Sequence, residues 1–88
     1  MENAGNMLWM PARVSDEKFA NDLARRVVAL RKIQGMTQLQ LADKLGLTQQ
    51  TVQRYESNQR RIPVSLLPPL ADALDASIDE LLGIAPKG

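Results

Sequence analysis

Apolar residues recur every three or four positions through residues 15–34, which is typical of a helix that buries one side. We expect Ser15 to be the N-cap of this helix. We expect Gly35 to end it in the left-handed conformation. The apolar stripe consists of Phe19, Leu23, Val27, Leu30 and Ile33 or Gln34.

Two short helices are expected between residues 37 and 57, joined by a turn at Gly46. Thr37 and Thr48 precede them, and each is the expected N-cap because a threonine oxygen accepts a hydrogen bond from a backbone N–H of the first turn. Gly46 supplies the conformational freedom that so short a turn requires. Asn58, after the second helix, tolerates the left-handed conformation better than most residues with a side chain.

The second of these helices has one apolar side and one polar side. Successive helical residues lie about 100° apart around the axis, so Val52 and Tyr55 share the buried side with the capping Thr48. The opposite, exposed side consists of Gln49, Gln50, Gln53 and Arg54.

Two more helices complete the pattern. Ser65 is the expected N-cap of the fourth helix, with Pro68 and Pro69 in its first turn, where a missing N–H costs little. The fifth helix begins with the capping box of residues 77–80 and ends at Gly83. The sequence shows no strand pattern, so it predicts an all-α fold of five short helices.

We divide the chain into an N-terminal arm (residues 1–14), one helical domain (15–83) and a C-terminal tail (84–88). The arm lacks periodicity but contains an apolar patch at residues 8–10. Trp9 in this patch packs onto its own domain, onto a second copy or onto another protein, and the sequence leaves these alternatives open.

Composition excludes several classes of protein. The 88 residues include no cysteine and no histidine, so a zinc enzyme or a histidine-dependent hydrolase is excluded, and we expect no metal and no cofactor. No apolar run approaches the roughly 20 residues that cross a bilayer, so we expect the protein in the cytoplasm with the nucleoid. Catalysis is the weakest hypothesis, because the acidic residues near the C-terminus lack metal-ligand spacing.

Charge is distributed unevenly, although the net charge is only +1. Residues 21–61 carry eight basic and three acidic side chains, whereas residues 62–88 carry four acidic side chains and one basic side chain. A basic middle segment and an acidic end favour one face that contacts phosphates and another that avoids them.

The exposed glutamine and arginine side chains suit the edges of DNA bases. Glutamine pairs with adenine and arginine with guanine in the major groove, and each pair discriminates between bases by about 1–3 kcal/mol. The alternative is that these four are ordinary solvated residues. Their common position on the second helix of a helix–turn–helix pattern favours base recognition. For Arg54, an ion pair with a nearby acid or a phosphate contact stays open.

The segment of about residues 37–57 resembles the helix-turn-helix domain of phage repressors and Cro, the Xre family. Ala42, Gly46 and Val52 match the spacing of that motif. The small Ala42 suits a close helix crossing. The resemblance covers about residues 22–83 and is strongest over 37–63. It implies a lambda-repressor-like fold of five short helices, with the helix-turn-helix at about 37–57, and a dimer on a palindromic operator.

The resemblance also implies roles for individual residues. Gln49, Gln50 and Arg54 would face base edges, and Gln53 would lie close to bases or backbone. Arg31 and Glu56 would form a structural ion pair. Phosphate contacts would come from Thr37, Gln38, Thr48, Thr51, Asn58, Gln59, Arg60 and Arg61. Asn58 stands where the family often has glycine, and the resemblance does not explain the arm.

The leading hypothesis is therefore a sequence-specific transcriptional regulator, a repressor that binds double-stranded DNA as a homodimer on an inverted repeat. The alternative is an antitoxin that binds a toxin partner through residues 8–10 and represses its own operon. A controller of a restriction-modification locus or a phage switch is a third, related hypothesis.

Overall fold

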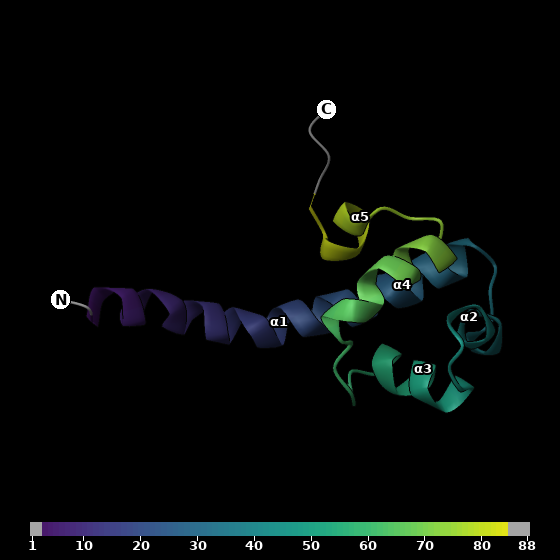
Figure 1. The fold of residues 1–88 in the computed structure, drawn as a ribbon, viewed down its shortest axis with the longest axis horizontal. Helices are drawn as coiled ribbons and strands as arrows, with labels where there is room; N and C mark the ends of the chain where they lie inside the picture. Colours follow the sequence, from purple (N-terminus) through teal and green to yellow (C-terminus); the bar gives the residue numbers. More distant parts are fainter. Residues whose placement is uncertain (1–2, 85–88) are drawn as a thin grey trace.

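The computed structural model describes the backbone of residues 3–84 and the side chains of residues 16–84. Within residues 3–84 there is no strand, and five α-helices and one 3-10 turn follow one another (Figure 1). They are α1 (Asn3–Ile33), α2 (Gln38–Leu45), α3 (Gln49–Glu56), η1 (Val64–Leu66), α4 (Leu67–Ala73) and α5 (Ile78–Leu82). The expected all-α fold of five helices is confirmed.

The start of α1 differs from the sequence prediction. The helix begins at Asn3 and runs through Ser15, which is therefore not an N-cap. A serine cap stabilises a helix end by only about 1 kcal/mol, so Ser15 alone does not fix where α1 begins, and the helix continues through Pro11 although proline disfavours a helix interior. The question of what Trp9 contacts falls outside the described side chains.

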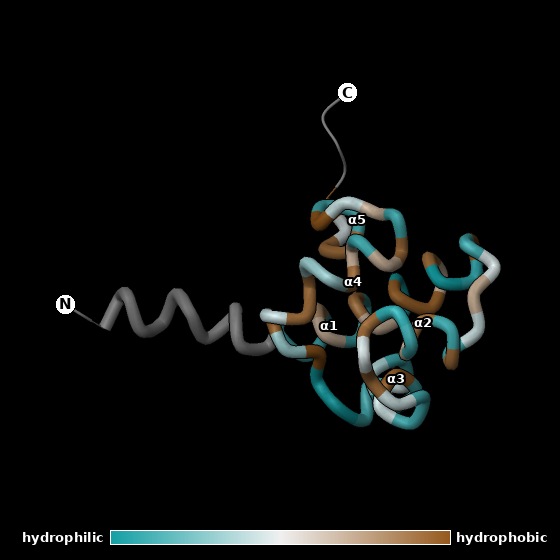
Figure 2. The backbone as a smooth tube through the Cα atoms, turned by 45° about the vertical axis from the view of Figure 1, so that its right-hand side comes forward, coloured by the Kyte–Doolittle hydropathy of each residue, from teal (hydrophilic) through white to brown (hydrophobic). Residues whose placement is uncertain are grey.

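The core lies where α1 meets the four shorter helices, and Figure 2 shows hydrophobic segments, in brown, within the helices that meet there. Phe19 and Ile33, at the two ends of the predicted stripe, are exposed by 42% and 74%. The shorter helices therefore cover only the middle of that stripe. The buried hydrophobic residues are Leu23, Ala24, Val27, Leu41, Ala42, Val52, Tyr55, Leu70, Ala71, Leu74 and Leu81.

Most of the predicted helix ends are confirmed. Thr37, Thr48 and Ser77 each accept a hydrogen bond from the backbone N–H three residues later. Gln40 completes a capping box with Thr37 that the sequence analysis did not identify. The glycines that follow α1, α2 and α5 are left-handed, with φ angles of 69°, 70° and 77° at Gly35, Gly46 and Gly83.

The predicted cap at Ser65 is wrong. Ser65 lies inside η1, and α4 begins at Leu67 without a side-chain cap. A serine cap at this position would need the N–H groups of residues 67 and 68. The N–H of Leu67 already donates to the carbonyl of Val64, and Pro68 has no N–H. One of the two donors is therefore absent at Pro68, and the other is already used within η1.

Candidate nucleic-acid interface

α2 and α3 form a rigid pair whose crossing depends on a small residue. Ala42 is fully buried and Val52 is 2% exposed, and both belong to the core cluster. The turn between the helices is closed by backbone hydrogen bonds. Gly46 N–H donates to the carbonyl of Asp43 and Leu47 N–H to that of Ala42, at 3.3 and 2.9 Å. The helix–turn–helix therefore holds α3 in a fixed orientation on the domain.

One side of α3 is buried and the other is exposed. Val52 and Tyr55 point into the protein, as the helical spacing predicts. The four residues predicted to contact bases are all exposed, and they are Gln49, Gln50, Gln53 and Arg54. No ion pair to Arg54 is found among the side chains of residues 16–84. This face therefore offers three amides and one guanidinium.

Thr48 and Thr51 lie together at the N-terminus of α3. The Oγ1 atom of Thr48 accepts a hydrogen bond from the N–H of Thr51, and the two Oγ1 atoms are 2.9 Å apart. Thr48 is exposed and Thr51 is half-buried. Both hydroxyls therefore lie at the positive end of the helix dipole, where an anion is favoured.

The far end of α3 is held by a nearly buried ion pair. Nε and Nη2 of Arg31 donate to Oε2 and Oε1 of Glu56, at 2.6 and 3.0 Å. Nη1 of Arg31 donates to the carbonyl of Met36, 2.8 Å away. Gln38 donates from Nε2 to Oε1 of Glu56, at 3.0 Å. This network joins α1, the start of α2 and the end of α3.

The hydrogen bond from Gln38 to Glu56 was not predicted from the sequence. Gln38 was predicted to contact phosphate, but here its side chain is half-buried against Glu56. The two residues are eighteen positions apart on different helices, and no local pattern signals their contact. A phosphate contact at the start of α2 stays a prediction.

The loop after α3 is closed by backbone hydrogen bonds to the end of that helix. Asn58 is left-handed, with φ 59°, so it adopts the conformation for which the family often has glycine. The N–H groups of Gln59 and Arg60 both donate to the carbonyl of Arg54, at 2.9 and 3.2 Å. The side chains of Gln59, Arg60 and Arg61 are exposed.

Two side chains of α1 bind this loop, and no local pattern in the sequence predicts these contacts. Nδ2 of Asn58 donates to Oδ1 of Asn21, at 3.2 Å. Nη2 of Arg61 donates to Oε2 of Glu17, at 3.1 Å. The structure thus brings one predicted phosphate residue of the loop, Arg61, beside an acidic side chain.

Further along α1, Asp22 has a lowered pKa. The main cause is a hydrogen bond that its carboxylate accepts from Lys18, with additional attraction to the charges of Lys18, Arg26 and Arg25. The Lys18–Asp22 pair spans 3.0 Å within α1. The ammonium of Lys18 is therefore already paired within its own helix.

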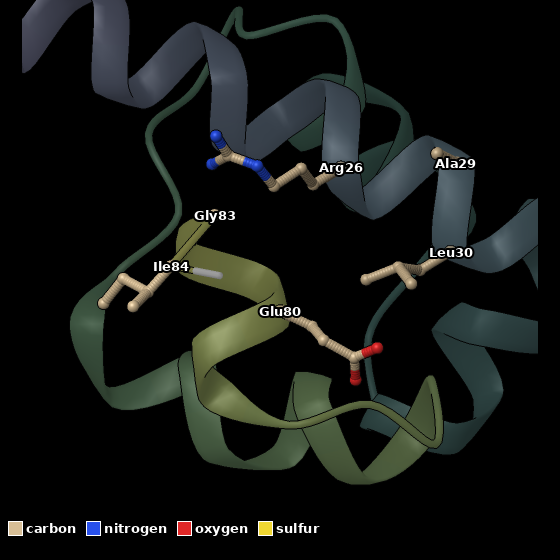
Figure 3. Close-up of a pocket in the computed structure, with 6 residues that line it drawn as sticks. All are labelled: Arg26, Ala29, Leu30, Glu80, Gly83 and Ile84. Carbon is tan, nitrogen blue, oxygen red and sulfur yellow. The ribbon is translucent and has the colours of Figure 1, made fainter. Parts of the chain in front are cut away.

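A hollow of about 340 Å³ lies between α1 and the end of α5 (Figure 3). Two of the side chains that line it, Arg26 and Glu80, carry opposite charges. Nη1 of Arg26 donates to the carbonyl of Leu81 at 3.4 Å, and its guanidinium lies against Gly83. The lining residues are Arg26, Ala29, Leu30, Glu80, Gly83 and Ile84.

Two further features concern only the part of the chain that the structure describes. There, no three acidic side chains are placed to hold a metal ion together. In the same part, no helix has both the length and the apolar character needed to span a membrane.

Comparison with known proteins gives consistent matches. The helix-turn-helix family matches residues 27–81. The cryptic phage CTXphi transcriptional repressor RstR of Vibrio cholerae is 38% identical over 61 residues, which are 69% of this chain and 54% of RstR. The chain spans about half the length of the curated relatives it matches.

Two solved structures share the fold, each with a TM-score of 0.64. The restriction-modification controller protein C.AhdI from Aeromonas hydrophila is 33% identical, and the match covers 68% of this chain and 91% of C.AhdI. The P22 c2 repressor, solved in complex with a synthetic operator, is 25% identical, and the match covers 72% of this chain and 96% of the repressor chain.

Proposed function

Because the chain belongs to the helix-turn-helix family, we propose that it is a sequence-specific DNA-binding repressor that acts as a homodimer on an inverted-repeat operator. We expect no enzymatic activity, since RstR and the P22 c2 protein are repressors and C.AhdI is a restriction-modification controller. The observation that carries the proposal is the exposed polar face of α3 on a rigid helix pair.

α3 is the recognition helix and enters the major groove. Its exposed amides both donate and accept hydrogen bonds, which suits adenine, and the Arg54 guanidinium suits guanine. Base recognition also requires a fixed helix, because a helix that rocks on its domain cannot keep side chains in register with base edges. The buried Val52 and the bond from Arg31 to Glu56 fix α3 at its middle and its end.

Phosphate contacts flank the recognition helix. Thr48 and Thr51 lie at its N-terminus, and the exposed Arg60 and Arg61 follow its C-terminus. Arginines that neutralise phosphates release counterions, so binding weakens as salt rises. The remaining proposed phosphate contacts are Thr37, Gln38, Asn58 and Gln59.

A homodimer supplies the specificity that one small module lacks. Two copies on half-sites about 34 Å apart read twice as many base pairs. We place the contact between copies at the α1–α5 hollow, which Ile84, 54% exposed, lines together with Ala29 and Leu30 (Figure 3). Arg26 and Glu80 line the same hollow with opposite charges, and a two-fold contact brings the same patch of both copies together.

Repression is proposed because RstR and the P22 c2 protein are repressors. C.AhdI, a restriction-modification controller, keeps that related role open. The antitoxin alternative depends on the side chains of residues 8–10, which fall outside the described ones, so it stays a prediction without support from the comparisons.

Selection of binding sites from random double-stranded oligonucleotides tests this function. We expect the purified protein to enrich a sequence with two-fold symmetry and half-sites about one helical turn apart. Enrichment of a single asymmetric site would contradict the dimer while keeping base recognition. Recovery of unrelated sequences by a folded protein would contradict sequence-specific binding itself.

A further inference from the structure

The loop that carries the proposed phosphate arginines is bound to α1 at two points. Glu17 and Asn21 are four residues apart and so lie on one face of the helix. Glu17 accepts a hydrogen bond from Arg61 and Asn21 accepts one from Asn58. This face of α1 therefore holds both the left-handed residue of the loop and its last arginine.

The two contacts differ in charge, and only one of them engages a residue that is proposed to bind phosphate. The bond between Asn21 and Asn58 is neutral and helps to fix the shape of the loop. The bond between Glu17 and Arg61 joins opposite charges 3.1 Å apart, and it engages the guanidinium that is proposed to contact phosphate. Lys18, next to Glu17, is already paired with Asp22.

We propose that Glu17 competes with DNA phosphate for Arg61 and so lowers the affinity of the protein for duplex DNA of any sequence. This inference rests on the proposed function. Carboxylate and phosphate bind a guanidinium in the same geometry, so the two anions are alternative partners.

The pair is weak enough to exchange. The side chains of Arg61 and Glu17 are 56% and 79% exposed, and exposed pairs of this kind are screened by water and salt. A duplex, with one phosphate charge per about 1.7 Å of helix axis, therefore displaces the carboxylate. Because no base contact is involved, Glu17 lowers specific and non-specific binding by the same factor and leaves sequence discrimination unchanged.

The variant Glu17→Gln isolates the charge. Its amide oxygen still accepts a hydrogen bond from Arg61, so the loop keeps its contact with α1. Fluorescence anisotropy would measure the dissociation constants of a labelled duplex of random sequence and of a selected site. The double-mutant cycle consists of the protein without substitutions, Glu17→Gln, Arg61→Gln and the double variant, and a control variant is measured beside it.

We expect Glu17→Gln to bind both duplexes about two- to fivefold more tightly, the range that an exposed ion pair allows. In the Arg61→Gln background the same change should give no gain, because the competitor then has no target. Asp43→Asn is the matched control, since it removes one negative charge from an exposed position on α2. We expect it to fall short of the gain from Glu17→Gln.

Weaker or unchanged binding by Glu17→Gln would overturn the inference. An equal gain in the Arg61→Gln background, or from Asp43→Asn, would also overturn it, because the effect would then be general electrostatics. Failure of the proposed function is distinguishable from failure of this inference. In that case the protein without substitutions would bind neither duplex.

Discussion

Arg31 on α1 and Glu56 on α3 lie 25 positions apart in the sequence and are joined by two hydrogen bonds, Nε to Oε2 at 2.6 Å and Nη2 to Oε1 at 3.0 Å. Their side chains are only 11% and 5% exposed. Gln38 and the Met36 carbonyl satisfy further atoms of the pair. A buried pair with its remaining hydrogen bonds satisfied orients α3 and leaves a buried charge when either partner is lost.

The first prediction concerns this pair. Glu56→Ala should lower the free energy of unfolding by about 3–5 kcal/mol, because it leaves the guanidinium of Arg31 buried without its partner. Urea and thermal unfolding measure the change. Gln50→Ala, an exposed change on the same helix, is the control and should leave stability within about 0.5 kcal/mol. Equal melting temperatures for the two variants would contradict a structural role for the pair.

The second prediction compares two left-handed glycines. A Cβ at Gly46 meets no atom within 4 Å, whereas a Cβ at Gly83 would overlap the guanidinium of Arg26. Gly46→Ala should therefore cost only the backbone strain, about 1–2 kcal/mol. Gly83→Ala should cost more, because Arg26 must also leave the Leu81 carbonyl. Equal unfolding free energies for the variants would show that Arg26 moves without loss.

Base recognition by α3 gives the third prediction. Gln50→Ala should weaken binding to the selected site by about 1–3 kcal/mol, with no comparable loss on an unrelated duplex. Gln34→Ala is the matched control, since Gln34 is an exposed glutamine in the turn after α1. Anisotropy titrations on both duplexes measure the ratio. Unchanged discrimination by Gln50→Ala would remove this residue from the base contacts.

The fourth prediction separates the two loop arginines. Arg60→Ala and Arg61→Ala should each weaken binding to every DNA sequence. Each should also reduce the slope of log affinity against log salt concentration by about one. Arg61→Ala should lose less affinity, because Arg61 must leave Glu17 to reach a phosphate. Titrations between low and physiological salt give both slopes. An unchanged slope for either variant would remove that arginine from the phosphate contacts.

Local signals in the sequence predicted much of the fold. Thr37, Thr48 and Ser77 cap helices because their oxygens reach a backbone N–H three residues away, a relation visible in the sequence alone. Gly46 adopts the left-handed turn for the same local reason. The exposed face of α3 followed from helical spacing, and the resemblance to the Xre family is confirmed by the helix-turn-helix match.

The missed features depend on contacts across the fold or on competing local signals. Gln38 bonds to Glu56, and Glu17 bonds to Arg61, 44 positions away. No local pattern pairs such residues. Ser15 and Ser65 each carry a capping signal, but α1 continues through the first, and at the second Pro68 lacks an N–H while the N–H of Leu67 bonds to Val64.

The most direct test of the central claim is footprinting of the purified protein on the DNA upstream of its own gene across a series of salt concentrations. The account predicts a protected inverted repeat, with affinity that falls steeply as salt rises because phosphate contacts release counterions. A folded protein that protects no site at moderate salt would contradict the claim that α3 recognises an operator.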